Sequence, residues 1–314
     1  MKNITIMGGG VLGSQIAFQS AYCGFNVTIW LRSKESIKRT QPKLDELKKT
    51  YLSAIDKMAT ETGKNLDDWC LGISSSDDFD KEKCIQHLNL AYDNIKLELD
   101  IEKSLKDSDL VIESMTEDFN AKKELYLKMK PLIKETTIIV TNSSTMLPSK
   151  LAKYTNNPEN FLALHFANSI WKNNIVEVMK HAKTEKKAFD EVIKFSKEIN
   201  MIPLPLAKEK SGYLLNSMLI PFLFASLDLY VTGISDPKSI DTAWTRGTGA
   251  PEGPFQILDK VGLKTAYDIV EMYVKIPSFI APYHFKEMSK LLKEYINNGK
   301  LGKSAGEGFY KYDK

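Results

Sequence analysis

Residues 3–13 read NITIMGGGVLG, and this stretch decides the fold. A short apolar strand over Asn3–Met7 runs into a glycine turn, and Val11–Tyr22 then carries small and apolar residues at helical spacing. A second strand, rich in β-branched residues, follows at Asn26–Leu31. A strand, a glycine turn, a helix and a second strand in immediate succession predict a parallel βαβ unit.

The glycine turn has the G-x-G-x-x-G spacing of a dinucleotide-binding loop. Its first glycine permits the tight turn, the second lets the backbone approach a pyrophosphate, and the third lets the helix pack close to the strand. Free N–H groups at the start of the helix would face the phosphates. The alternative is a glycine-rich turn without a ligand. The residues predicted to bind the dinucleotide are Gly8, Gly10, Val11, Leu12 and Gly13.

The second strand ends without the acidic residue that usually binds the adenine ribose. Leu31 stands at that position, followed by Arg32, Ser33 and Lys34. A guanidinium, a hydroxyl and an ammonium group suit a 2′-phosphate, and no carboxylate is present to repel it. The cofactor is therefore NAD or NADP, with NADP favoured through Arg32 and Ser33. Alternatively, the cations are solvated and the selectivity is loose.

The rest of the chain divides into an α/β part and a helical part. A polar stretch, residues 33–90, predicts a helical excursion on the surface, with one helix over Pro42–Thr60. Strand patterns return at 95–99, 109–113, 137–141, 160–166, 176–179 and 202–206, and only helical patterns follow from about Ser211. We predict an α/β Rossmann-like N-terminal domain over residues 1–207 and an all-α C-terminal domain over residues 208–314.

Composition excludes several classes of protein. A hydrophobic fraction of 43% and a charged fraction of 26% are ordinary for a globular protein, and a net charge of +3 gives no footprint for nucleic acid. The longest apolar run, residues 213–230, is interrupted by polar residues, so no membrane span is expected. Three cysteines without CxxC spacing and four histidines without metal-ligand spacing predict reduced thiols, a cytoplasmic location and no metal.

Three residues point to proton-transfer chemistry. His165 ends an expected strand in LALHFAN, and Glu177 lies within the apolar strand IVEVM, where an unpaired carboxylate would be costly. A His–Glu pair would remove that cost and would form a tuned general base. Ser144 follows the strand at 137–141, at the carboxyl edge where ligands bind in such sheets.

At this point the chain resembles the L-3-hydroxyacyl-CoA dehydrogenase family, which includes short-chain 3-hydroxybutyryl-CoA dehydrogenases. The resemblance extends from Asn3 to Tyr312, and only residues 35–95 lack a clear match. The matching segments occur in family order: IMGGGVLG, DLVIESMTEDFNAKKELY, TNSSTML, ALHFAN, IVEVM, GYLLNSMLIPFL, GPFQILDKVGL and GEGFYKY.

The resemblance implies a role for each matching residue. His165 would be the base that takes the proton of the 3-hydroxyl group, and Glu177 would orient and polarise it. Ser144 would contact the substrate oxygen, and Asn216 would lie near the substrate carbonyl. The further positions implied at the cofactor are Glu117, Lys122, Asn142 and Asn168. Each residue also has a purely structural alternative, such as a helix-cap serine, a buried amide or a solvated lysine.

The resemblance also implies an acyl-CoA substrate, fatty acid metabolism and a homodimer formed through the helical domain. Two departures bear on the substrate. HFANSIWKNN replaces the usual HFFNP-type run, so the loop with Trp171 is expected to reshape the acyl end of the pocket, and residues 35–95 replace the region that holds CoA. The predicted function is interconversion of L-3-hydroxyacyl-CoA and 3-ketoacyl-CoA. The alternatives are a dehydrogenase of a free 3-hydroxy acid, as in the gulonate and carnitine dehydrogenases, and a catalytically silent dinucleotide-binding protein.

Overall fold

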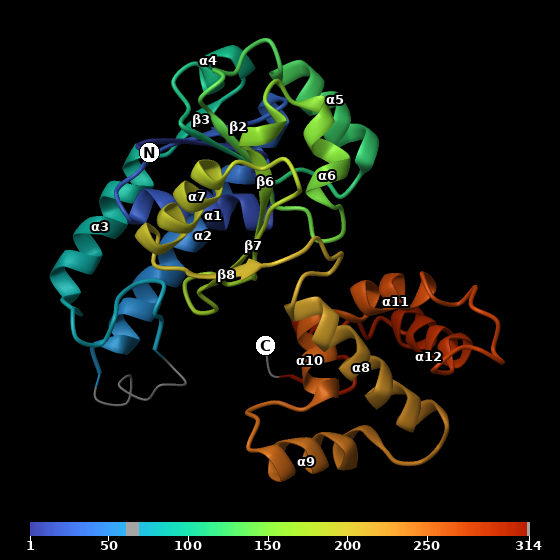
Figure 1. Ribbon diagram of the computed structural model, residues 1–314. Helices are drawn as coiled ribbons and strands as arrows, with labels where there is room; N and C mark the ends of the chain where they lie inside the picture. The colour runs from blue at the N-terminus through green and yellow to red at the C-terminus, as the bar shows by residue number, and fades with distance from the viewer. Residues whose placement is uncertain (61–68, 313–314) are drawn as a thin grey trace. The chain divides into compact units, whose positions relative to one another are not determined.

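The computed structural model describes residues 1–60 and 69–312. The chain forms two compact units, Met1–Leu214 and Leu215–Lys314 (Figure 1). The first unit therefore extends beyond Ala207, where the sequence patterns place the boundary. Residues 207–214 stay with the first unit because they contact it: Ser211 Oγ donates to Thr145 O at 2.8 Å, and Tyr213 is buried in a cluster with β-strand residues.

The first unit is built on an eight-stranded sheet with the order β3-β2-β1-β4-β5-β6-β7-β8. Strands β1 to β6 are parallel, as the sequence predicts, but β7 runs antiparallel to β6 and β8 follows the direction of β7. The segment 167–174 that joins β6 to β7 is too short for a crossover, so these strands form a hairpin. The strands are β1 (Asn3–Met7), β2 (Asn26–Trp30), β3 (Lys96–Glu98), β4 (Leu110–Glu113), β5 (Ile138–Thr141), β6 (Phe161–Phe166), β7 (Ile175–Met179) and β8 (Ile202–Leu206).

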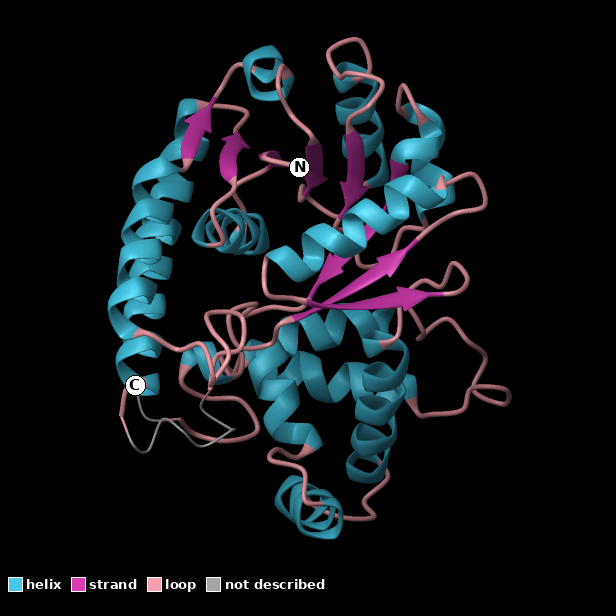
Figure 2. Cartoon of the chain, turned by 60° about the vertical axis from the view of Figure 1, so that its left-hand side comes forward, coloured by secondary structure: helices cyan, strands magenta, loops and turns pink. Residues whose placement is uncertain are grey.

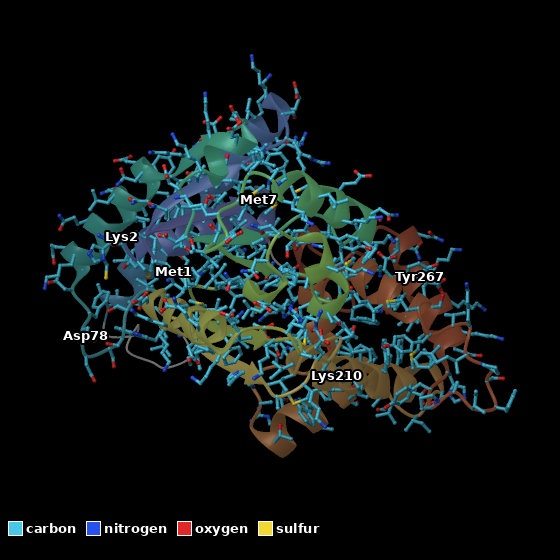
Figure 3. The ribbon with its side chains drawn as sticks, turned by 45° about the horizontal axis from the view of Figure 1, so that its top comes forward. Met1, Lys2, Met7, Asp78, Lys210 and Tyr267 are labelled. Carbon is cyan, nitrogen blue, oxygen red and sulfur yellow. The ribbon has the colours of Figure 1, made fainter. Side chains whose placement is uncertain are left out.

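Helices cover both faces of this sheet (Figure 2). Alternate residues of β1 point to opposite faces, so Ile6 packs with one hydrophobic cluster and the fully buried Met7 with the other. Met7 is labelled in Figure 3. The helices of this unit are α1 (Val11–Tyr22), α2 (Lys34–Met58), α3 (Lys81–Asn94), α4 (Ile101–Leu105), α5 (Phe119–Met129), α6 (Pro148–Leu151) and α7 (Lys186–Glu198).

The excursion after β2 consists mainly of α2 and α3, which pack against each other and against α1. Helix α2 begins at Lys34, well before the expected Pro42, because Ser33 caps it and accepts a hydrogen bond from Ser36 N at 3.3 Å. Gln19 of α1 links α1 to the excursion by hydrogen bonds: its side chain donates to Gly72 O at 2.7 Å and accepts from Tyr51 Oη of α2 at 2.5 Å.

In its described part the second unit is built from helices and has no β-strand, only isolated β-bridges at Gly302, Glu307 and Lys311. The helical pattern after residue 254 is divided at Gly262, whose φ of 92° lies outside the helical region. Two buried carboxylates, Asp241 and Asp259, bind the backbone N–H groups of the segments they contact, Phe255 and Phe309 among them. The helices are α8 (Leu215–Val231), α9 (Pro237–Thr248), α10 (Pro254–Val261), α11 (Leu263–Glu271) and α12 (Phe285–Asn297). Across residues 1–60 and 69–312, no helix is both long enough and apolar enough to cross a membrane.

Candidate active site

The glycine turn between β1 and α1 leaves one side open. Gly8 has a φ of 114°, which favours glycine, and its N–H donates to Trp30 O at 3.1 Å. A Cβ atom on Gly13 would lie 2.1 Å from Gly8 O, so only glycine lets the helix start here. A Cβ atom on Gly10 would meet nothing within 4 Å. The turn is therefore packed at Gly8 and Gly13 and accessible at Gly10.

Gly9, which the motif leaves free, is also fixed by packing. A Cβ atom there would lie 2.2 Å from Thr40 Oγ1, and this hydroxyl donates to Gly9 O at 3.1 Å. The contact brings α2 against the turn. At the other side of the turn, Val11 is 63% exposed at the start of α1, and Leu12 packs partly into the core.

A cavity lies against the turn and the end of β2. Three cationic side chains line it, Arg32, Arg39 and Lys43, and no lining residue carries a carboxylate. Arg39 Nη2 donates to Ser36 Oγ at 3.0 Å, and Ser36 also lines the cavity. Ser33, the hydroxyl that the sequence favours, caps α2 and does not line the cavity. Arg39 and Lys43 carried no sequence signal, because they sit among many charged residues on the surface of α2.

His165 and Glu177 are directly opposite each other in the antiparallel β6–β7 pair. The His165 Nδ1 and Glu177 Oε2 atoms are 2.9 Å apart, and the two residues are 7% and 2% exposed. The second Glu177 oxygen, Oε1, accepts the N–H of Leu214 at 2.7 Å. His165 Nε2 lies 3.1 Å from the Oγ of the half-buried Ser144. The structure thus joins the three predicted residues in one chain of contacts.

A second buried charge lies beneath the turn that carries Ser144. Glu113, at the end of β4, is fully buried and accepts four hydrogen bonds, which include Lys122 Nζ at 2.7 Å and Tyr126 Oη at 2.9 Å. The other two donors are Met115 N and Thr141 Oγ1. Lys122 is 1% exposed, so it is a structural partner of Glu113 rather than a solvated charge. Sequence analysis assigned Glu113 no role, although an acidic residue ending an apolar strand is the signal that could have found it.

Glu117 holds the residues on both sides of Ser144. Its Oε1 accepts from Ser143 Oγ at 2.5 Å and from the N and Oγ1 of Thr145 at 2.9 and 2.7 Å. Lys122 Nζ lies 3.6 Å from its other oxygen. Burial alone would raise the pKa of Glu117, but the hydrogen bonds from Ser143 and Thr145 and the charge of Lys122 outweigh it and hold the pKa below its ordinary value.

The remaining predicted residues occupy different positions. Asn142 bridges two strands: its Oδ1 accepts the N–H of Phe166 at 3.0 Å. Asn168 is exposed in the loop after β6. In the same loop the ring of Trp171 packs against Tyr51 of α2, with 5.7 Å between ring centroids. Asn216 belongs to the second unit, where it is the second residue of α8 and half-buried.

Both units match known families. Residues 3–210 match the family profile described as 3-hydroxyacyl-CoA dehydrogenase, NAD binding domain, and residues 212–312 match that of the C-terminal domain of the same enzymes. The chain is 30% identical to the human mitochondrial hydroxyacyl-coenzyme A dehydrogenase over 312 residues, which cover 99% of this chain and 91% of that protein. It is 28% identical to the 3-hydroxybutyryl-CoA dehydrogenase of Clostridioides difficile, with 99% of each chain covered.

A solved structure of a diketoreductase, described as performing substrate-directed dual catalysis of dicarbonyl compounds, is also similar. It shares 40% sequence identity with this chain and superposes with a TM-score of 0.84, and 99% of each chain is covered.

The depressed pKa of Glu117 gives a pH dependence of stability. The contribution of this carboxylate is complete above its ordinary pKa of 4.5 and is lost as the pH falls through the lower pKa of the folded state. We expect the free energy of unfolding to fall as the pH drops below the ordinary pKa of 4.5, and to fall less steeply in Glu117→Gln. Denaturant titrations across this pH range measure both slopes.

Glu124→Gln is the matched control, since Glu124 lies on helix α5 shortly after Glu117, is exposed and has no hydrogen-bond or ion-pair partner within residues 1–60 and 69–312. It should keep the slope of the unaltered protein. Equal slopes for all three proteins would show that Glu117 is not the group that titrates.

Proposed function

The chain belongs to the 3-hydroxyacyl-CoA dehydrogenase family, and from that premise we propose that it interconverts a short-chain L-3-hydroxyacyl-CoA and the corresponding 3-ketoacyl-CoA with a nicotinamide cofactor. The observation that carries the proposal is the contact chain from Glu177 through His165 to Ser144. A buried carboxylate, an imidazole and a hydroxyl in this order form a general base with one nitrogen available to a substrate.

The residues of the glycine turn fit a dinucleotide. The backbone at Gly10 is free of neighbouring atoms on the side where a Cβ would stand, and the N-terminus of α1 begins at the next residue. Val11 and Leu12 present the first N–H groups of that helix, which favour a pyrophosphate. When bound, the nicotinamide ring accepts or delivers the hydride.

The side chain of His165 accepts and delivers the proton of the 3-hydroxyl group, with the help of Glu177 and Ser144. With Glu177 ionised, the His165 Nδ1–H donates to it, so Nε2 is the nitrogen that accepts a proton from a 3-hydroxyl group. Ser144, 3.1 Å from Nε2, is placed to hydrogen-bond the same substrate oxygen. A proton on Nε2 leaves an imidazolium beside a carboxylate in a buried site, which stabilises the charged ring. By family resemblance, Asn168 remains a proposed contact near the nicotinamide and the substrate, and Asn216 a proposed contact near the substrate carbonyl.

The second candidate function is reduction of a 3-keto compound that carries no CoA. The observation in its favour is the 40% identity to the diketoreductase over 99% of both chains. The proton chemistry is the same for both substrates, because Nε2 of His165 interacts with the oxygen on carbon 3 in either case. The difference lies in what binds the rest of the substrate.

A substrate panel separates these functions. Acetoacetyl-CoA, free acetoacetate and a diketo ester, each tested with NADPH and NADH, are followed by the absorbance of the reduced nicotinamide. We expect the highest kcat/KM with acetoacetyl-CoA. Turnover only of the compounds without CoA would establish the second candidate, and no turnover of any substrate would favour a silent dinucleotide-binding protein.

Replacing the carboxylate tests the base. In Glu177→Gln the amide NH2 group can donate to Nδ1, which forces the proton onto Nε2 and removes the acceptor. We expect kcat to fall by about 10²- to 10⁴-fold. Glu159→Gln, at an exposed carboxylate of the same unit, is the control and should retain kcat. An unchanged kcat in Glu177→Gln would remove the dyad from the mechanism.

We further propose that the cofactor is NADP. Arg32 and Arg39 reach the cavity at the end of β2 from two different elements, and Lys43 lines it one turn farther along α2. An NAD-specific site needs a carboxylate for the ribose hydroxyls, and the lining residues provide none. The cluster suits the two negative charges of a 2′-phosphate.

The cations should decide between the two cofactors. Charge-assisted hydrogen bonds contribute enough free energy that Arg32→Ala and Arg39→Ala should each lower kcat/KM for NADPH by roughly ten- to a hundredfold, with little change for NADH. Lys38→Ala, at an exposed lysine of α2 that does not line the cavity, is the control. A protein that prefers NADH, or whose preference survives both arginine substitutions, would contradict an NADP site.

A homodimer formed through the helical unit is proposed on the basis of its exposed apolar side chains. Ile234, Met272 and Phe279 are 70%, 69% and 87% exposed, a degree that favours burial against a second copy. Sedimentation equilibrium should give twice the 35.5 kDa of one chain at micromolar concentration. A mass of one chain under these conditions would refute the dimer.

We also propose a cytoplasmic location and a place in fatty acid metabolism. The thiols of Cys23, Cys70 and Cys84 are not joined by disulfide bonds, as expected in a reducing compartment. The metabolic assignment follows from the proposed acyl-CoA substrate.

A further inference from the structure

One residue of the first unit contacts the histidine of the proposed base from a side that neither Glu177 nor Ser144 occupies. The ring of Tyr213 lies face to face with the His165 imidazole, with 4.5 Å between ring centroids and 15° between ring planes. Tyr213 is 1% exposed. Glu177 and Ser144 contact the two nitrogens of the His165 ring, and Tyr213 covers one of its faces. The ring therefore has little freedom to tilt.

The hydroxyl of the same tyrosine reaches the turn that carries the serine. Tyr213 Oη donates to Ser143 O at 2.7 Å, and Ser143 immediately precedes Ser144. Burial raises the pKa of Tyr213 well above its ordinary value, so the phenol remains a hydrogen-bond donor at neutral pH. The tyrosine thus links the serine turn to the imidazole.

The backbone that follows Tyr213 completes the arrangement. Leu214 N–H donates to Glu177 Oε1, so two consecutive residues contact the histidine, the serine turn and the carboxylate. This requires an unusual backbone: Tyr213 has a φ of 52°, and Gly212 before it has a φ of 81°. A left-handed tyrosine is energetically costly and persists only where its surroundings determine it, and such residues cluster at functional sites.

We propose that Tyr213 is a positioning residue for proton transfer. Its ring sets the plane of the His165 imidazole, and its hydroxyl fixes the position of the turn that carries Ser144. The inference rests on the proposed function of the dyad. The hydrogen bond from Nδ1 to Glu177 fixes the direction in which this edge of the imidazole points. One hydrogen bond does not prevent the ring plane from tilting. The aromatic face supplies the missing constraint.

Two substitutions separate the ring from the hydroxyl. Tyr213→Leu removes both, and we expect kcat to fall on the order of 10- to 100-fold while KM for substrate and cofactor stays within about twofold. Tyr213→Phe keeps the stacked ring and should recover most of the lost kcat. Tyr51→Leu, at a fully buried tyrosine that contacts neither the dyad nor the serine turn, is the control for a general loss of stability.

The activity readout has two decisive results. Loss of kcat in Tyr213→Leu with recovery in Tyr213→Phe supports the positioning role. Wild-type kcat in Tyr213→Leu, or a loss of kcat no larger than that of Tyr51→Leu, overturns it.

A spectroscopic readout keeps the test independent of substrate. A ring stacked on the imidazole shields its Cε1 and Cδ2 protons, so the His165 signals should lie upfield in the unaltered protein and in Tyr213→Phe. In Tyr213→Leu they should move downfield and broaden as the imidazole gains orientations. If the unaltered protein turns over no substrate, the proposed function fails, and these signals alone decide: their persistence in Tyr213→Leu overturns the positioning role. If Tyr213→Leu does not fold, Tyr213→Asn, whose side chain tolerates a left-handed backbone, replaces it in both readouts.

Discussion

A carboxylate buried within a β-strand must be paired, and the pairing of Glu177 organises the centre of this protein. Its two oxygens accept from His165 on β6 and from the backbone of Leu214. The first contact requires the antiparallel register that puts positions 165 and 177 opposite each other. The second requires the chain after β8 to turn inward through a left-handed tyrosine. Removing one partner of such a buried pair costs about 3–5 kcal/mol, so the fold and the site are constrained together.

A second buried pair supports the serine. Glu113 and Lys122 are almost fully buried, and Lys122 also lies near Glu117, whose carboxylate holds Ser143 and Thr145. Charged side chains therefore support both parts of the site: Glu113, Lys122 and Glu117 lie next to the turn that carries Ser144, and Glu177 lies next to His165. The two networks meet at Ser144, the residue whose hydroxyl contacts Nε2. Pre-organisation of this kind lowers the reorganisation needed when a proton moves.

The βαβ start, most strands and the set of His165, Glu177 and Ser144 could be predicted because each has a local sequence signal. These signals are glycines at fixed spacing, a polar residue within an apolar strand, or a polar residue directly after one. Other features leave no such signal. Arg39 and Lys43 look like solvated charges until α2 is folded against the turn, and Tyr213 looks like ordinary core in an apolar run. The reversed direction of β7 depends on the short connection after β6, and the unit boundary depends on hydrogen bonds made by residues 207–214.

The central claim is that Glu177 fixes the His165 proton on Nδ1 and leaves Nε2 free. Nitrogen-15 NMR of histidine-labelled protein tests this directly, at a pH where the ring is neutral, with His165→Gln identifying the signal. We predict the Nδ1–H tautomer, with an unprotonated Nε2, and its loss in Glu177→Gln. The Nε2–H tautomer in the unaltered protein would contradict the account, because the nitrogen facing Ser144 would then have no lone pair to accept a proton.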